Sequence, residues 1–155
     1  MREICIYAKP PIPGRTKSRL ARDIGPDAAA GLAQALLLDA CDAALQLPDC
    51  RVRLWHPPDS TPADFAGIVP AGIDFAGQQG ADLGARMART FKEVLSAGAE
   101  RAILIGTDCV THCVASFERA FAALARHQVV LESADDGGYV LVGQSAPCAA
   151  LFVDV

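Results

Sequence analysis

Short runs of apolar and β-branched residues alternate along the chain with stretches in which apolar residues recur every three or four positions. Runs of the first kind predict β-strands, and stretches of the second kind predict α-helices. Residues 101–106 form an almost wholly apolar run, which is typical of a central strand covered on both faces. We therefore expect strands at residues 3–8, 51–55, 73–75, 101–106, 128–132 and 138–143, and helices at about 27–46, 83–97 and 114–124.

Helix boundaries are marked by capping and breaking residues. Asp27 and Asp82 are suited to cap the first turns of the first two helices, and Gly98 is placed to end the second. The first helix is rich in Ala and Leu, and we expect it to bury one face of apolar side chains: Leu32, Leu36, Cys41 and Leu45.

This order of elements predicts an α/β protein: a single domain over residues 1–155, built as a three-layer α/β/α sandwich around a mainly parallel sheet. The last strand can pair antiparallel, because mixed sheets of this kind are common. Ligands of such folds bind outside the carboxyl ends of the strands. Three polar segments fall at those ends in this chain, at residues 9–19, 107–108 and 135–139.

Composition and charge narrow the function. The 155 residues are 52% hydrophobic and 21% charged, which argues against disorder, and no signal-peptide pattern precedes the first strand, so we expect a cytoplasmic protein. The net charge is −4, yet residues 1–22 carry six basic side chains and one acidic one. A basic segment in an acidic protein favours a small anionic ligand over a nucleic acid; a solvated basic loop is the alternative.

The basic segment is the first candidate site. Lys9, Arg15, Lys17 and Arg19 can neutralise phosphates, and Gly14 allows backbone amides to approach a ligand. The segment is not a Walker A loop, because Gly14 is separated from Lys17.

Acidic residues supply two further candidates. Asp108 follows the central strand, where it can hold Mg²⁺ together with phosphate oxygens or, alternatively, cap the next turn. In Asp135-Asp136-Gly137-Gly138, the glycines form a tight turn into the last strand, or they permit close backbone approach while an aspartate, Asp135 or Asp136, reaches the metal or ligand.

The start of the second helix is a fourth candidate. Gly80 and Arg86 can help a helix N-terminus hold an anion or a polar base edge, whereas capping alone explains Asp82. The six cysteines are expected to be reduced thiols, and a metal or redox site at Cys109, His112 and Cys113 is a weaker hypothesis.

These four segments, in this order, resemble a small bacterial family described as glycosyltransferase-like, "transferase one, radical-SAM/selenodomain-associated". The resemblance rests on four segments, which are Ala8–Leu20, Gly80–Met87, Ile105–Cys109 and Asp135–Gly143. More distantly, the first and third are similar to segments of guanylyltransferases that act on phospholactate or the molybdopterin cofactor. The chain departs from the family at Val110, where the family usually has Pro, and at Asp154-Val155, beyond which family members continue, so we expect the family's C-terminal segment to be missing.

The resemblance implies a GT-A fold of the nucleotide-diphospho-sugar transferase type and a Mg²⁺- or Mn²⁺-dependent nucleotidyl- or glycosyltransferase. The partners of such an enzyme would be a nucleotide or nucleotide-sugar and a small-molecule acceptor. It would bind neither nucleic acid nor a membrane, and a homodimer is one of its open oligomeric states. Asp108 would hold the metal together with Asp136, and Lys17 and Asp108 would be catalytic. The nucleotide would contact Lys9, Gly14, Arg15, Lys17, Arg19, Gly80, Asp82, Arg86, Gly137 and Gly138. The alternative is a catalytically degenerate nucleotide-binding or interaction module of the same fold.

Overall fold

The computed structural model describes residues 1–153, and its centre is a six-stranded sheet in the order β3-β2-β1-β4-β6-β5. Strands β3, β2, β1 and β4 run parallel to one another, whereas β6 runs antiparallel to both β4 and β5. The mainly parallel sheet and its antiparallel last strand are therefore confirmed. The strands are β1 (Arg2–Tyr7), β2 (Cys50–His56), β3 (Ile73–Gly77), β4 (Arg101–Ile105), β5 (Val129–Ser133) and β6 (Tyr139–Gln144).

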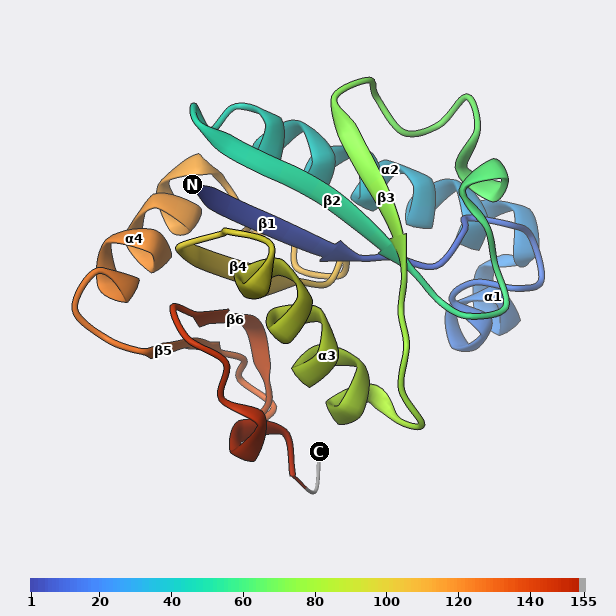
Figure 1. Ribbon diagram of the computed structural model, residues 1–155. Helices are drawn as coiled ribbons and strands as arrows, with labels where there is room; N and C mark the ends of the chain where they lie inside the picture. Colours follow the sequence, from blue (N-terminus) through green and yellow to red (C-terminus); the bar gives the residue numbers. More distant parts are fainter. Residues whose placement is uncertain (154–155) are drawn as a thin grey trace.

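Helices cover both faces of this sheet, as the three-layer prediction requires (Figure 1). The three expected helices are present, and three short elements were not predicted: α1 and two 3₁₀ turns. The helical elements are α1 (Ser18–Ile24), α2 (Pro26–Leu45), η1 (Pro62–Phe65), α3 (Leu83–Ser96), α4 (Val114–Leu124) and η2 (Ala149–Phe152).

Strand β4 is the buried centre of the sheet, as its apolar run predicts. Ile103 and Ile105 are fully buried on the face covered by α2 and α4, where they meet Leu37 and Phe117. Successive strand residues point to opposite faces, so Leu104 packs on the other side. Both faces of β4 are thus enclosed, and the loop after Ile105 emerges from a rigid base.

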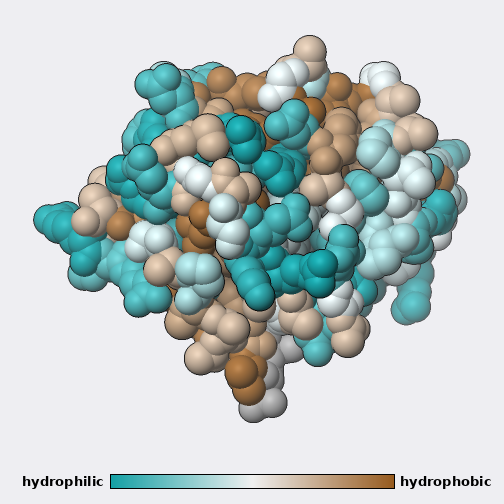
Figure 2. Space-filling view, viewed as in Figure 1, coloured by the Kyte–Doolittle hydropathy of each residue, from teal (hydrophilic) through white to brown (hydrophobic). Residues whose placement is uncertain are grey.

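On the second face, α3 and η2 form the cover. Phe91 of α3 stacks on Phe152 of η2 with ring centroids 5.9 Å apart. A Cβ built on Gly84 would collide with the Phe152 carbonyl oxygen, so only glycine lets η2 approach α3 this closely. Seen from this side, the surface is hydrophilic across its middle, with a hydrophobic patch towards its lower edge (Figure 2).

A buried ionic network also lies on this face, at the amino end of β1. The Glu3 side chain is completely buried and lies 3.3 Å from Arg53 Nε, while Arg53 Nη1 lies 3.7 Å from Glu93 on α3. Burial raises the pKa of Glu3, and the positive charges of Arg53 and Arg51 oppose that rise. The network ties β1 and β2 to α3.

The buried face of α2 differs from the predicted one. Of the four residues expected there, Cys41 alone is fully buried, while Leu32 and Leu45 are 41% and 37% exposed. Small side chains take most of the buried positions instead, which are Ala29, Ala30, Leu37, Ala40, Cys41 and Ala44. Alanines allow the helix to lie close to the sheet, so the expectation based on the leucines was wrong.

Helix α2 is also long and apolar enough to cross a membrane by length and composition. In the structure 44% of its apolar window is buried, and its inner face packs against β1, β2 and α4. The core helix of a soluble protein meets the same criteria, so α2 does not indicate a membrane protein.

Candidate functional site

The carboxyl ends of β1 and β4 lie side by side, because these strands are parallel neighbours in register. The chain passes from β1 outward to β2 and β3 and then returns to place β4 on the other side of β1, so the strand order reverses between β1 and β4. A reversal of this kind opens a crevice at the carboxyl ends of the two strands, where ligands of open α/β sheets bind.

A cleft of about 710 Å³ occupies this position. Ligand pockets for small molecules typically span about 300–1,000 Å³, so the cleft has the size of a small-molecule site. Its lining combines the loop after β1, the start of α1, the loop after β4 and single residues of α2 and α3: Tyr7, Lys9, Thr16, Lys17, Ser18, Arg19, Leu20, Ala33, Leu83, Gly106, Thr107 and Asp108.

An ion pair crosses this cleft. The Lys17 Nζ donates a hydrogen bond to Asp108 Oδ1 at 2.7 Å. The Lys17 side chain is only 19% exposed, whereas that of Asp108 is 81% exposed, so the ammonium is held against the wall while most of the carboxylate faces solvent. Two predicted residues separated by 91 positions in the sequence are thus brought into direct contact.

Lys17 also has an unusual backbone. Its φ of 46° and ψ of 48° lie in the left-handed region, and it occupies the N-cap position of α1. That conformation costs a non-glycine residue roughly 1–2 kcal/mol. Such strain concentrates at functional sites, where surrounding contacts fix it, and here the strained residue is the one whose side chain pairs with Asp108.

Charge in the cleft is mainly positive. Lys9 and Arg19 join Lys17 in the lining, where Asp108 supplies the negative charge. The lining also contains the apolar side chains of Leu20, Ala33 and Leu83. A ligand with an anionic end and a flat or apolar end would match this combination.

Tyr7, which was not predicted from the sequence, also lines the cleft. Its hydroxyl hydrogen-bonds the Thr90 hydroxyl at 2.8 Å, and burial raises the pKa of Tyr7 to about 12. The phenol therefore stays neutral near pH 7 and contributes shape and a hydrogen bond rather than charge. Tyr7 could have been predicted as a lining residue from its place at the carboxyl end of β1.

The other predicted site residues lie outside the cleft lining. Arg15 points to the loop after β2, where its guanidinium lies 3.3 Å from the Asp59 carbonyl oxygen and 3.8 Å from the Asp59 carboxylate. Gly14 is exposed in the preceding turn. The basic segment therefore divides, with Lys9, Lys17 and Arg19 in the cleft and Arg15 turned away.

At the start of α3, the predicted residues make local contacts. Asp82 caps the helix by accepting a hydrogen bond from the Ala85 amide at 2.7 Å, which confirms the capping prediction. Arg86 donates from Nε to the Gly80 carbonyl oxygen at 3.2 Å. The neighbouring Leu83 does line the cleft, so this helix start borders the site without placing its polar side chains in the lining.

The acidic glycine segment forms the β5–β6 turn. Asp136 Oδ1 accepts a hydrogen bond from the Gly138 amide at 3.0 Å, and the Gly137 amide donates to the Ala134 carbonyl oxygen at 3.2 Å. These bonds match the turn alternative. The segment lies at the same edge of the sheet as Asp108, but its residues do not line the cleft.

The segment after Asp108 leads into α4. Cys113 occupies the N-cap position of that helix, and a hydrogen bond from the Ser116 amide lowers the pKa of its thiol. His112 packs on Phe117 with ring centroids 5.6 Å apart, and burial lowers its pKa. Within residues 1–153, no group of three or more His, Cys, Asp or Glu side chains is arranged to hold a metal ion, so the metal hypothesis for Cys109, His112 and Cys113 gains no support.

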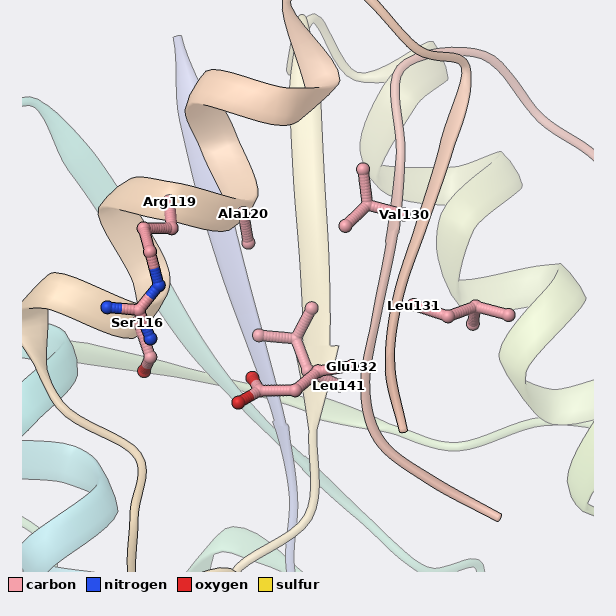
Figure 3. A pocket seen from close by; sticks show the side chains of 7 residues that line it. All are labelled: Ser116, Arg119, Ala120, Val130, Leu131, Glu132 and Leu141. Carbon is pink, nitrogen blue, oxygen red and sulfur yellow. The ribbon is translucent and has the colours of Figure 1, made fainter. Parts of the chain in front are cut away.

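A smaller cavity of about 210 Å³ lies between α4 and the strands β5 and β6 (Figure 3). Arg119 reaches it from the helix and Glu132 from the opposite side, with Leu141 at its base. It contains none of the residues predicted for the site. We therefore take the larger cleft as the candidate site.

Comparison with known proteins places the chain in a family. Residues 37–155 match the family described as "Uncharacterized protein conserved in bacteria (DUF2064)". The chain belongs to this family. The match includes Asp108 and the segment that forms the β5–β6 turn, whereas the basic segment precedes it. No curated protein sequence matches this DUF2064 protein.

Solved structures identify the fold of this DUF2064 protein as that of nucleotide-diphospho-sugar transferases. A Desulfovibrio desulfuricans G20 protein, provisionally named as such a transferase, has a TM-score of 0.92 and 28% identity over 99% of this chain and 68% of its own. A 4-diphosphocytidyl-2C-methyl-D-erythritol synthase from Anaerococcus prevotii DSM 20548 has a TM-score of 0.56 and 11% identity over 97% and 71% of the two chains. A manganese complex of a Mycobacterium tuberculosis H37Rv protein has a TM-score of 0.56 and 16% identity over 99% and 75%.

Proposed function

We propose that this DUF2064 protein transfers a nucleotidyl or glycosyl group from a nucleotide or nucleotide-sugar donor to a small-molecule acceptor, with the help of a divalent cation. The observation that carries the proposal is the cleft at the ends of β1 and β4, which brings Lys9, Lys17 and Arg19 together with Asp108. The transferase-like fold, shared over nearly the whole chain with the Desulfovibrio protein, supports the same class of reaction.

Within the cleft, the cationic side chains would bind the phosphates of the donor. Arg19 offers a planar, bidentate donor set, and Lys9 and Lys17 act as point charges. By neutralising oxygens that gain charge in the transition state, they would lower the barrier to attack on a phosphoryl or anomeric centre. Leu20, Ala33 and Leu83 would exclude water from one side of the donor.

Asp108 fits the role of a metal ligand. Its carboxylate follows a buried strand and is 81% exposed, and a Mg²⁺ ion is commonly held by one or two carboxylates plus substrate phosphates. Mg²⁺ or Mn²⁺ at Asp108 would supply further charge neutralisation at the phosphates. The Mycobacterium structure of the same fold contains manganese, which agrees with a divalent cation in this class of protein. Asp136 would need to leave its turn to join the site, so we assign the metal to Asp108 first.

The test is a thermal-shift panel of nucleoside triphosphates and nucleotide-sugars, each with and without Mg²⁺. A ligand that binds only the folded protein stabilises it by mass action, by about 2.7 kcal/mol at a ligand concentration of 100 times Kd. This gain in stability raises Tm. We expect a subset of nucleotides to raise Tm, and more so with Mg²⁺. No shift with any nucleotide at millimolar concentration would contradict the proposal.

An assay of product formation distinguishes the proposed transferase from a degenerate binding module that binds nucleotide without turnover. Nucleotides identified by the panel would be incubated with candidate acceptors and assayed for pyrophosphate or nucleoside diphosphate. Release of either product supports the transferase. Nucleotide binding without release across the acceptors would support the binding module instead, for which Val110 and the local contacts of Arg15 and Arg86 are the motivating features.

A further inference from the structure

The Lys17–Asp108 ion pair places a positive charge where the proposed metal would bind. Lys17 Nζ lies 2.7 Å from Asp108 Oδ1, which is the distance of a direct charge-assisted hydrogen bond. One carboxylate oxygen is therefore already engaged by a cation. A divalent ion that approached the same carboxylate would be repelled by the ammonium as well as attracted by the aspartate.

Asp108 also does not belong to a cluster of metal-binding side chains in the part of the chain that the structure describes. The described residues contain no group of three or more His, Cys, Asp or Glu side chains arranged around a common point. A single carboxylate shared with a lysine is a poor site for a free divalent ion, because hard cations need several oxygen ligands. The missing oxygens would have to come from the phosphates of the donor.

Those phosphates would also compete for Lys17. Its side chain lines the same cleft as Lys9 and Arg19 and is only 19% exposed, so its ammonium stays at the cleft wall rather than in solvent. A bound polyphosphate carries more negative charge than one aspartate and would attract the ammonium away from Asp108.

We propose that Lys17 is a gate for the metal: in the nucleotide-free protein it occupies Asp108 and keeps divalent cations off, and the phosphates of the donor release it. This inference rests on the proposed function, which it deepens by assigning the order of binding. Because coupling between two ligands is reciprocal, metal and nucleotide then strengthen one another's binding, and the free protein does not hold the ion alone.

The gate is tested by titrating Mn²⁺ into the full chain without nucleotide and following free Mn²⁺ by electron paramagnetic resonance. Lys17→Met removes the ammonium but keeps an unbranched side chain. We expect it to bind Mn²⁺ about tenfold more tightly than the wild type, within the usual range of coupling between sites. In the double variant Lys17→Met/Asp108→Asn this gain should disappear.

Lys9→Met is the matched control, because it removes one positive charge from the same cleft without touching the ion pair. A gain of Mn²⁺ affinity equal to that of Lys17→Met would show a general charge effect and overturn the gate. So would a Lys17→Met protein that binds Mn²⁺ no better than the wild type. If Lys17→Met does not fold, Lys17→Gly replaces it, since glycine suits the left-handed backbone at this position.

Failure of the gate is distinguishable from failure of the proposed function. If nucleotides with Mg²⁺ raise the Tm of the wild type while Lys17→Met shows no gain in Mn²⁺ affinity, the transferase proposal stands and the gate is wrong. If no nucleotide shifts Tm, both fail together.

Discussion

At the scale of single residues, Asp108 is the side chain on which the proposed chemistry depends. Asp108→Asn keeps the shape but removes the charge, and an amide is a much poorer ligand for a hard cation. We expect nucleotide affinity to become independent of Mg²⁺, measured by isothermal titration, and transferase activity to fall by about 100-fold or more. Stability should change by no more than about 1 kcal/mol, because the ion pair is largely exposed on the aspartate side.

The outcome that contradicts this assignment is simple. If Asp108→Asn binds the Mg²⁺–nucleotide complex as tightly as the wild type, then Asp108 is not a metal ligand. A matched comparison is Asp59→Asn, whose carboxylate faces Arg15 outside the cleft. That variant should keep the full Mg²⁺ dependence.

A second prediction concerns the buried Glu3. Arg53→Met would leave its carboxylate without its nearest positive charge, and breaking a buried pair in this way costs about 3–5 kcal/mol. The loss should depend on pH. Because the folded-state pKa of Glu3 is already raised and would rise further, protonation favours the folded variant, so its deficit should shrink from about pH 7 to about pH 5. Urea unfolding at both pH values measures this.

In contrast, Arg51 lies 3.8 Å from Glu3 and its side chain is 37% exposed, so Arg51→Met serves as the milder control. A deficit of Arg53→Met that is equal at both pH values would show that Glu3 does not titrate between them. The loss would then come from an unpaired charge that stays ionised, together with lost packing of the guanidinium on Trp55.

The charged residues of the sequence predicted part of the cleft lining. Lys9, Lys17, Arg19 and Asp108 could be predicted because charged residues after β1 and β4 must emerge at the same edge of the sheet. The contact between Lys17 and Asp108 could not, because neither strand order nor periodicity gives the backbone conformation of Lys17 or the path of its side chain. The position of Arg15 outside the cleft lining could not be predicted either, because only the folded loop after β2 puts Asp59 within its reach.

At the scale of elements, the contact between α3 and η2 depends on a missing side chain. Gly84→Ala would drive a Cβ into the Phe152 carbonyl oxygen, so η2 has to move. We expect a loss of about 1–3 kcal/mol in urea unfolding, which is typical of overpacking.

Gly31 in α2 is the matched control, because nothing lies within 4 Å of the Cβ that alanine would add there. Gly31→Ala should stabilise the protein by about 0.5–1 kcal/mol, since alanine is the better helix former. Equal effects of the two substitutions would contradict close packing of η2 on α3.

Two substitutions of Asp82, which caps α3, distinguish a structural role of this residue from a role in nucleotide binding. Asp82→Ala removes the acceptor for the Ala85 amide and should cost about 1 kcal/mol, whereas Asp82→Asn keeps an acceptor and should cost less. Thermal unfolding gives the stability of both variants, and nucleotide titration gives their affinities. If Asp82→Asn lowers nucleotide affinity without lowering stability, Asp82 belongs to the site.

The elements themselves were predictable where periodicity is strong. Strand β4 and helix α4 are marked by apolar patterns, and the structure confirms both. Helix α1 buries none of its residues and so lacks the apolar stripe that would reveal it. The buried face of α2 was predicted wrongly because the prediction followed its most hydrophobic residues. Leu32 and Leu45 are more hydrophobic than the alanines of α2, but the small side chains are those that fit against the sheet.

At the scale of the whole molecule, charge is separated between the basic cleft and an acidic remainder. The protein has a net charge of −4, yet three cations line the cleft. Attraction of phosphates to these cations is screened by salt, with a Debye length of about 10 Å at 0.1 M. Nucleotide affinity should therefore fall several-fold when NaCl is raised, measured by titration at low and high salt. Affinity for the matching nucleoside should not change, and a nucleotide affinity that is equally indifferent to salt would contradict phosphate binding by the cleft.

The antiparallel strand β6 has a consequence for synthesis of the protein. It lies between β4 and β5, although it follows both in the chain, so the ribosome releases the middle strand of this half of the sheet after its two neighbours. Until residues 139–144 emerge, β4 has an unpaired edge beside Leu104 and Ile105, and β5 has no neighbour to join. The nascent chain can already carry Lys17 and Asp108 at that stage, but the sheet that supports them is open to pairing with other chains. Completion of the sheet thus waits on β6.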